Sequence, residues 1–290
     1  MVIISINGRL GNQMFCFALY QCMLKMGKDV FVDLACDREN GEQDICSDLK
    51  YNAGIFNLDY RIADKDVAIE MIKDGCERNI WKRWKYRLMP SQCKFYGEKK
   101  QGTFDKRVFE LDDVYLHGYW QTEKYFAAIA DEIRRIYRFP DLYSDDQRKM
   151  LDKITAKHSV SVHIRRGDYL KRPDIYGTVS LEYYKNAMEY IQKRKENVHF
   201  YMFTDDIPWV EQNFKGKNIT IVKNESNDLL TRNLDMALMA ECEDNIIANS
   251  SFSWWAAWLN HNQDRTIIAP KEWEVNKLTK DIWCNNWIKM

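Results

Sequence analysis

The sequence predicts an α/β protein made of two Rossmann-like domains whose parallel sheets face each other across a cleft. Short apolar runs rich in β-branched residues alternate with helical stretches along all 290 residues. Helical crossovers between successive strands imply parallel pairing. The polar stretch from Pro140 to Asp146 interrupts the alternation, so we expect one domain over residues 1–145 and a second over residues 146–290.

The first domain begins with a predicted strand over residues 2–6, a Gly-rich turn, a helix over 13–26 that ends at Gly27, and a strand over 29–34. Residues 38–60 are polar and irregular. Further helices are expected over 64–74, 77–89 and 122–137, with a strand between them at 113–118. This strand–turn–helix–strand unit is typical of a parallel sheet.

The second domain repeats the alternation from residue 159 onward. Its predicted strands cover 159–165, 198–206, 219–222, 245–249 and 266–270. Its predicted helices cover 180–195, 206–214, 228–242 and 251–260, and the tail 271–290 is expected to pack back as a helix or loop. Because open parallel sheets bind ligands at the carboxyl ends of their strands, functional residues are expected there.

Composition excludes several classes of function. The chain has 43 basic and 43 acidic residues, and this zero net charge argues against a nucleic-acid-binding protein. No signal peptide and no apolar run of membrane-spanning length is found, so eight cysteines predict a reducing cytoplasm. The cysteines and five histidines lack zinc-site spacing. Asp-x-Asp occurs only at residues 64–66, where it begins a predicted helix, so no metal is expected.

The first candidate site is the loop Gly8-Arg9-Leu10-Gly11-Asn12, between the first strand and the first helix. Glycines let a ligand approach the backbone closely, and a helix N-terminus favours anions. A tight turn without a ligand explains the same residues equally well. The loop matches neither the Gly-x-Gly-x-x-Gly pattern nor a Walker loop.

The second candidate site lies at the end of the strand 159–165. With a side-chain period of two, His163 and Arg165 project from one face, and Gly167 permits a turn into Asp168. A guanidinium can bind two phosphate oxygens at once, so this strand end predicts a phosphate site. The alternative is a purely structural ion pair between Arg165 and Asp168.

A third candidate site begins the helix at 251–260, where Ser250, Ser251 and Phe252 follow an apolar strand. Hydroxyls and unpaired backbone N–H groups at a helix N-terminus also favour anions. Asp205 ends the predicted strand 198–206. Asp235 lies on the predicted helix 228–242, before the strand 245–249, and an aspartate on a helix is usually only a surface residue. The tryptophans at 254, 255 and 258 are expected mainly in the core.

Four ordered blocks resemble the α-1,2-fucosyltransferases of glycosyltransferase family 11. They are NGRLGNQMF (7–15), HIRRGDY (163–169), FTDD (203–206) and ANSSFSWWAAW (248–258), accompanied by HGYWQTEKYF (117–126) and IIAPKEW (267–273). The resemblance runs almost from end to end. One departure is Arg9, which stands where many members have a small residue.

The resemblance implies a GT-B-like fold and inverting transfer of L-fucose from GDP-β-L-fucose to a terminal sugar, often galactose, on a glycan that is lipid-linked in many bacterial relatives. It places the donor on the C-terminal domain, with Arg165 at the β-phosphate and Asp235 at the guanine. Asp168 is the candidate base. The predicted catalytic residues are Arg165, Asp168 and Asn12, and the predicted donor-binding residues are Gly8, Arg9, Leu10, Gly11, Asn12, His163, Arg165, Asp205, Asp235, Ser250, Ser251 and Phe252.

Other interpretations stay open. A sibling enzyme would form another linkage, and a silent relative would bind a GDP-sugar without transferring it. The stretch 78–100 is basic and carries Trp81 and Trp84, which fits either contact with an anionic membrane at the inner face or a packed helix with a solvated basic side. The acceptor and the oligomeric state are not encoded in any motif that we can interpret.

Overall fold

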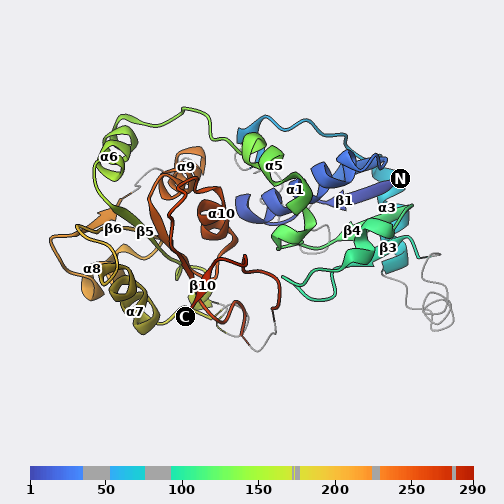
Figure 1. The fold of residues 1–290 in the computed structure, drawn as a ribbon. Coiled ribbons are helices and arrows are strands. Elements are labelled where there is room, and N and C mark those ends of the chain that lie inside the picture. The colour runs from blue at the N-terminus through green and yellow to red at the C-terminus, as the bar shows by residue number, and fades with distance from the viewer. Residues whose placement is uncertain (35–52, 76–92, 172, 174–176, 224–228, 276–278) are drawn as a thin grey trace. The chain divides into compact units, whose positions relative to one another are not determined.

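The computed structural model describes residues 1–34, 53–75, 93–171, 173, 177–223, 229–275 and 279–290. The chain divides into unit 1, Met1–Arg138 with Lys280–Ile282, and unit 2, Phe139–Thr279 with Trp283–Met290. Each unit is built around one parallel sheet flanked by helices (Figure 1). The predicted α/β class, with two parallel sheets, is confirmed.

The sheet of unit 1 has the strand order β2-β1-β4-β3. Its strands are β1 Val2–Ser5, β2 Val30–Asp33, β3 Phe95–Gly97 and β4 Val114–His117. In the centre, Ile3 and Ile4 are fully buried, as expected for a strand covered on both faces. The predicted strands of this domain are present, and β3 is an additional one that its three half-buried residues did not reveal.

The helices of unit 1 differ in detail from the prediction. They are α1 Leu10–Lys25, α3 Lys65–Gly75 and α5 Ala130–Ile136, with 3₁₀ turns at Ala53–Phe56, Lys106–Glu110, Glu123–Tyr125 and Ala127–Ile129. The helix starts three residues earlier than predicted, because extended Arg9 is its N-cap. The continuous helix expected over 122–137 is wrong, since Phe126 and Ile129 leave the helical backbone conformation. The helix expected at 77–89 lies outside the described residues.

The sheet of unit 2 has the strand order β10-β9-β8-β5-β6-β7. Its strands are β5 Ser159–Ile164, β6 His199–Thr204, β7 Ile219–Val222, β8 Asp244–Ile246, β9 Ile267–Ala269 and β10 Ile288–Lys289. Strand β5 pairs with both β6 and β8, and all six of its residues are buried. The tail therefore ends in a strand beside β9, not in the helix or loop expected.

The helices of unit 2 are α6 Asp145–Thr155, α7 Leu181–Gln192, α8 Ile207–Asn213, α9 Leu229–Ala240 and α10 Ser251–Leu259. The prediction missed α6, which begins where the linker was expected and has a capping box between Ser144 and Gln147. Trp254 and Trp255 are completely buried, as expected for core residues. Within the described part of the chain, no helix is long and apolar enough to cross a membrane.

Candidate active site

The carboxyl end of β5 carries a guanidinium held by two carboxylates. Arg165 follows the strand directly, with Nη2 at 2.8 Å from Asp168 Oδ1 and Nη1 at 2.9 Å from Asp205 Oδ2. Burial lowers the pKa of Arg165, but the two carboxylates more than offset it, so this pKa is raised overall. The ion pair with Asp168, the structural alternative, is therefore present. Its two contacts leave further N–H groups of the five-donor guanidinium for a ligand.

His163 lies two residues before Arg165 and is 7% exposed. Its Nδ1 is buried and has no hydrogen-bond partner within the described chain. Burial and the nearby charge of Arg165 lower the pKa of His163 to about 4, against a smaller opposing effect of Asp205. The imidazole is therefore neutral at pH 7. A buried polar nitrogen without a protein partner is able to bond to a ligand at this strand end.

Gly167 and Asp205 explain the tight turn after β5. The Arg166 backbone N–H donates to Asp205 Oδ1 at 2.8 Å. A Cβ at position 167 would lie 2.9 Å from Asp205 Oδ2, so a larger residue would collide with the carboxylate that holds Arg165. Asp205 was predicted as a donor-binding residue, and here it contacts both arginines of the turn.

Arg166 forms a second clamp that sequence reasoning missed. Its Nε lies 3.0 Å from Asp206 Oδ2, and its guanidinium carbon lies 4.2 Å from the centre of the Trp209 ring. Asp206 also caps α8 by accepting from the Trp209 backbone N–H. The pair Asp205-Asp206, which ends β6, was the available signal, because adjacent acids at a strand end face the adjacent arginines of the neighbouring strand.

The N-terminus of α10 lies beside His163. Phe252, in the first turn, has its ring centre 5.8 Å from the ring centre of His163. Ser250 is the N-cap and its side chain makes no capping bond. Both Ser251 and Phe252 are half-buried. The first N–H groups of a helix have no partner within it, so this end can receive an anion.

Tyr169 connects the turn after β5 to the segment between β8 and α10. Its hydroxyl donates to the Asn249 carbonyl oxygen at 3.0 Å, one residue before the Ser250 cap. A hollow of about 310 Å³ lies alongside, with Asn249 and Tyr183 in its lining.

Asp235 lies half-buried on α9 in the same unit. No trio of His, Cys, Asp and Glu side chains able to bind a metal gathers in the described regions of the chain.

The loop after β1 forms the corresponding edge of unit 1. Gly8 has φ +72°, and a Cβ there would lie 2.5 Å from Asn12 Nδ2, so only glycine fits. Arg9 is exposed, but Leu10 is buried and can offer a ligand only backbone atoms. Gly11 lies inside α1 and is buried, so its expected placement in the turn before the helix is wrong.

Asn12 is held by Gln121, a residue not among those predicted for the site. Gln121 Nε2 donates to Asn12 Oδ1 at 2.7 Å, and Gln101 Nε2 donates to Gln121 Oε1 at 3.0 Å. Gln121 ends the HGYWQ block, which was the sequence signal for it.

The model of the family "Glycosyl transferase family 11" matches residues 1–290. The chain belongs to glycosyltransferase family 11. An α-1,2-colitosyltransferase of Escherichia coli is 30% identical over 94% of this chain and 92% of its own. A galactoside 2-α-L-fucosyltransferase of Bos taurus is 23% identical over 88% of this chain and 63% of its own. The solved fucosyltransferase NodZ from Bradyrhizobium has 15% identity and a TM-score of 0.44, over 88% of this chain and 92% of its own.

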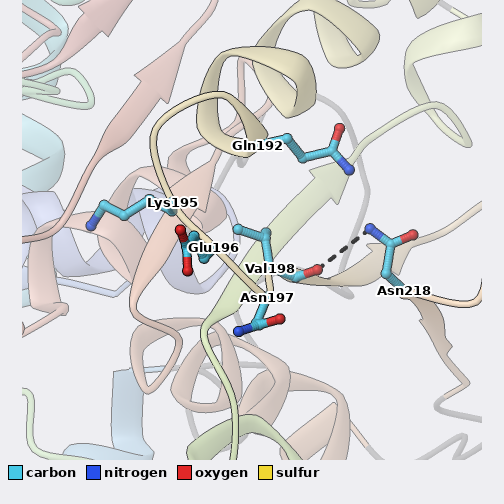
Figure 2. A pocket seen from close by; sticks show the side chains of 6 residues that line it. All are labelled: Gln192, Lys195, Glu196, Asn197, Val198 and Asn218. Carbon is cyan, nitrogen blue, oxygen red and sulfur yellow. Dashed lines mark hydrogen bonds between the residues drawn. The ribbon is translucent and has the colours of Figure 1, made fainter.

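Another hollow of this family 11 protein lies away from the predicted residues. It measures about 460 Å³ and includes Lys195, Asn197 and Val198, just before β6 begins, in its lining (Figure 2). Because the strands are parallel, this is the amino edge of the sheet, opposite the end that carries Arg165. The predicted membrane-contact stretch 78–100 lies largely outside the described residues, which include only 93–100 of it.

Proposed function

We propose that this family 11 glycosyltransferase moves L-fucose from GDP-β-L-fucose to the 2-hydroxyl of a terminal sugar, with galactose as the first candidate. One observation carries the proposal: a buried neutral His163 with an unpartnered Nδ1 lies at a strand end beside Arg165 and the N-terminus of α10. These groups offer N–H donors and positive potential to a diphosphate. The names of the relatives support the α-1,2 linkage.

The chemistry follows from where negative charge develops. When the bond between fucose C1 and the β-phosphate oxygen breaks, its electron pair stays on GDP. Arg165, fixed by Asp168 and Asp205, can stabilise this charge without reorganising, which favours the transition state over the bound substrate. His163 adds a neutral hydrogen-bonding group, and Ser250 and Ser251 belong to the helix end that faces an anion.

Inversion requires one displacement on the side of C1 opposite GDP. The acceptor hydroxyl oxygen forms the new bond to C1, and its proton passes to a base. Asp168 is our candidate for that base, since its side chain is 44% exposed and so accessible to an acceptor. The same carboxylate holds Arg165, so replacing it affects both leaving-group stabilisation and proton transfer. Asn12 is proposed to contact the substrates from unit 1.

We further propose that transfer needs no metal ion, because Arg165 supplies the positive charge that a divalent cation supplies in other enzymes. Purified protein is expected to keep full activity after dialysis against EDTA and to gain none from added Mg²⁺ or Mn²⁺. Loss of transfer with EDTA, restored by either ion, would contradict this part of the proposal.

The donor is tested by direct competition between GDP-fucose and GDP-colitose. Colitose is L-fucose without its 3-hydroxyl, so the two donors differ in one polar group. We expect GDP release and glycan product with GDP-fucose on galactose-terminated acceptors, and an α-1,2 linkage by NMR. Transfer of colitose but not of fucose would show that the donor is GDP-colitose. A product with another linkage would show that the protein is a sibling fucosyltransferase. Binding of the donor without GDP release would show that the protein is a non-catalytic relative.

A further inference from the structure

Three side-chain amides form a chain of hydrogen bonds at the carboxyl edge of the unit 1 sheet. They come from three separate segments: Gln101 after β3, Gln121 after β4, and Asn12 in the first turn of α1. Gln101 Nε2 donates to Gln121 Oε1 at 3.0 Å, and Gln121 Nε2 donates to Asn12 Oδ1 at 2.7 Å. Every donor in this chain points toward Asn12.

The direction of the chain determines how Asn12 is oriented. A carboxamide carries its acceptor and its donors on opposite sides, so Asn12, whose Oδ1 is occupied by Gln121, presents Nδ2 the other way. Gln121 is only 3% exposed, and a hydrogen bond in such surroundings is strengthened by low polarity and by its neighbour in the chain. The wrong orientation would bring two carboxamide N–H₂ groups together.

The loop against which Asn12 lies is also fixed. Gln13 Nε2 donates to the Gly8 carbonyl oxygen at 2.9 Å, and Gln13 Oε1 accepts from the Ala53 backbone N–H at 3.2 Å. Gly8 has no side chain, so Asn12 Nδ2 lies directly over its backbone. Nδ2 therefore has a defined place as well as a defined direction.

We propose that Gln121 is a positioning residue that orients the Asn12 carboxamide, so that Asn12 Nδ2 donates a hydrogen bond to an oxygen of the bound sugar substrate. This role rests on the proposed function. Gln121 touches no substrate itself and acts only through Asn12. Gln101 acts one link further away, by fixing the orientation of Gln121.

The experiment is a double-mutant cycle on sugar transfer. The wild-type protein, Gln121→Leu, Asn12→Ala and the double variant are compared by GDP release under single-turnover conditions, with enzyme in excess so that slow variants stay measurable. Gln121→Leu is expected to slow transfer about tenfold to hundredfold when Asn12 is present. In the Asn12→Ala background the same change is expected to alter the rate less than about twofold, since there is no carboxamide left to orient.

A matched control lies on the same helix. Gln21→Leu removes an amide from α1 whose side chain donates to the Asp59 carbonyl oxygen at 3.4 Å, about 13 Å along the helix from Asn12. It is expected to leave the rate unchanged. If Gln121→Leu lowers the melting temperature, the cycle is run with Gln121→Glu, which keeps the size of the side chain but cannot donate to Asn12.

Two results would overturn the assignment. An equal loss in both backgrounds would show that Gln121 acts independently of Asn12, as a merely structural residue would. No loss in the presence of Asn12 would show that its orientation does not matter. Absence of any transfer by the wild-type protein is a different failure: it would refute the proposed function, and the role of Gln121 would fall with it.

Discussion

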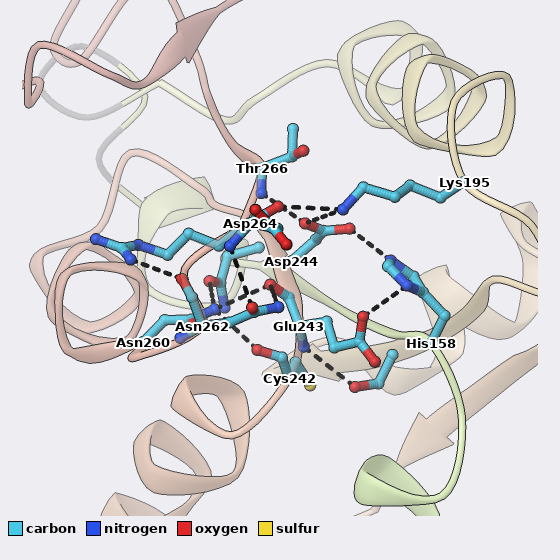
Figure 3. A network of polar contacts seen from close by, with 12 residues as sticks. His158, Lys195, Cys242, Glu243, Asp244, Asn260, Asn262, Asp264 and Thr266 are labelled. Carbon is cyan, nitrogen blue, oxygen red and sulfur yellow. Dashed lines mark hydrogen bonds and ion pairs between the residues drawn. The ribbon is translucent and has the colours of Figure 1, made fainter.

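Two histidines at opposite ends of β5 have opposite surroundings. His158, just before the strand, lies with Nδ1 at 2.6 Å from Glu243 Oε2 and Nε2 at 2.7 Å from Asp244 Oδ2 (Figure 3). His163, near the other end, is buried with Nδ1 unpartnered within the described chain. One strand therefore carries a histidine with both ring nitrogens bonded by protein and a histidine whose bonding is incomplete.

The difference separates polar groups that bond within the protein from a group that we propose bonds to the substrate. At the amino edge, Asp244 is completely buried and its carboxylate receives the His158 ring and the Thr266 backbone N–H at 2.5 Å. Asn260 bonds to the Cys242 carbonyl in the same network (Figure 3). Polar groups satisfied in this way stabilise the fold. An incomplete set, as at His163, has a cost in stability that a hydrogen-bonding ligand would remove.

The largest effect is expected from Arg165→Ala. Removing the guanidinium should lower kcat/KM about a thousandfold, because stabilisation of the leaving GDP is lost. The fold should persist, since Asp168 and Asp205 can then be hydrated. GDP release and circular dichroism measure the two properties. Arg148→Ala is the matched control, because this half-exposed guanidinium pairs with exposed Asp141. Wild-type turnover of the Arg165 variant would refute the site.

The opposite result is expected for Asp244→Asn at the amino edge. Replacing the buried carboxylate weakens its hydrogen bonds with the His158 ring and the Thr266 backbone N–H and should lower the free energy of unfolding by about 3 kcal/mol. The kcat of the folded variant should be unchanged, since the length of β5 separates the two ends by about 20 Å. Urea unfolding and GDP release test this. Lost transfer at unchanged stability would break the comparison.

The pH dependence of stability should also differ at the carboxyl end. The pKa of His163 is lowered to about 4 in the folded protein, against an ordinary value of 6.5. Between these pH values the unfolded chain binds more protons, so this contribution is complete above pH 6.5 and is lost as pH falls toward 4. The wild-type protein should lose up to about 3 kcal/mol more over this interval than His163→Gln.

Urea unfolding of both proteins at several pH values checks this expectation. The two curves of unfolding free energy against pH should be parallel above pH 7, and below pH 6 the wild-type curve should fall more steeply than that of His163→Gln. Curves that stay parallel down to pH 4 would mean that His163 is not held neutral by burial, and the account of its unpartnered nitrogen would fail.

The sequence predicted strands better than it predicted the details of the site. Runs of β-branched residues identify strands buried on both faces. These residues already favour the extended conformation, and pairing with neighbouring strands reinforces that preference. Strand β3 was not predicted, because its three residues pair with β4 through tertiary contacts that no local pattern encodes. Helix α6 was recoverable, since Ser144 and Gln147 have capping-box spacing. The neighbouring polar residues made this stretch resemble a linker.

Within the site, spacing placed Arg165 and His163 at one strand end, but it could not show their partners. Asp205, directly after β6, holds Arg165, and Gln121, in the segment after β4, holds Asn12. These contacts depend on which strands are neighbours in the sheet. Only His163 was predicted as a ligand-binding histidine, and the sequence did not show that Glu243 and Asp244, at the start of β8, bond to His158 at the other end of β5.

The smallest effect on the free energy of unfolding is expected for Lys195→Met, which tests how much this lysine contributes at the amino edge. Lys195 Nζ lies 3.7 Å from Asp244 Oδ1, beyond hydrogen-bond distance, and donates to the Asp264 carbonyl oxygen at 3.1 Å. Its side chain is 26% exposed, so water and salt screen its charge. We expect a loss of about 0.5 kcal/mol, decreasing further at 1 M salt.

Urea unfolding at low and high salt measures this loss beside that of Asp244→Asn. A loss as large as that of the aspartate variant would mean that Lys195, not His158, is the main partner of the buried carboxylate. Lys195, which lines the hollow before β6, would then stabilise the amino edge, and His158 would contribute little to stability. The shorter distance to this carboxylate, 2.7 Å from His158 Nε2 to Asp244 Oδ2, favours the histidine.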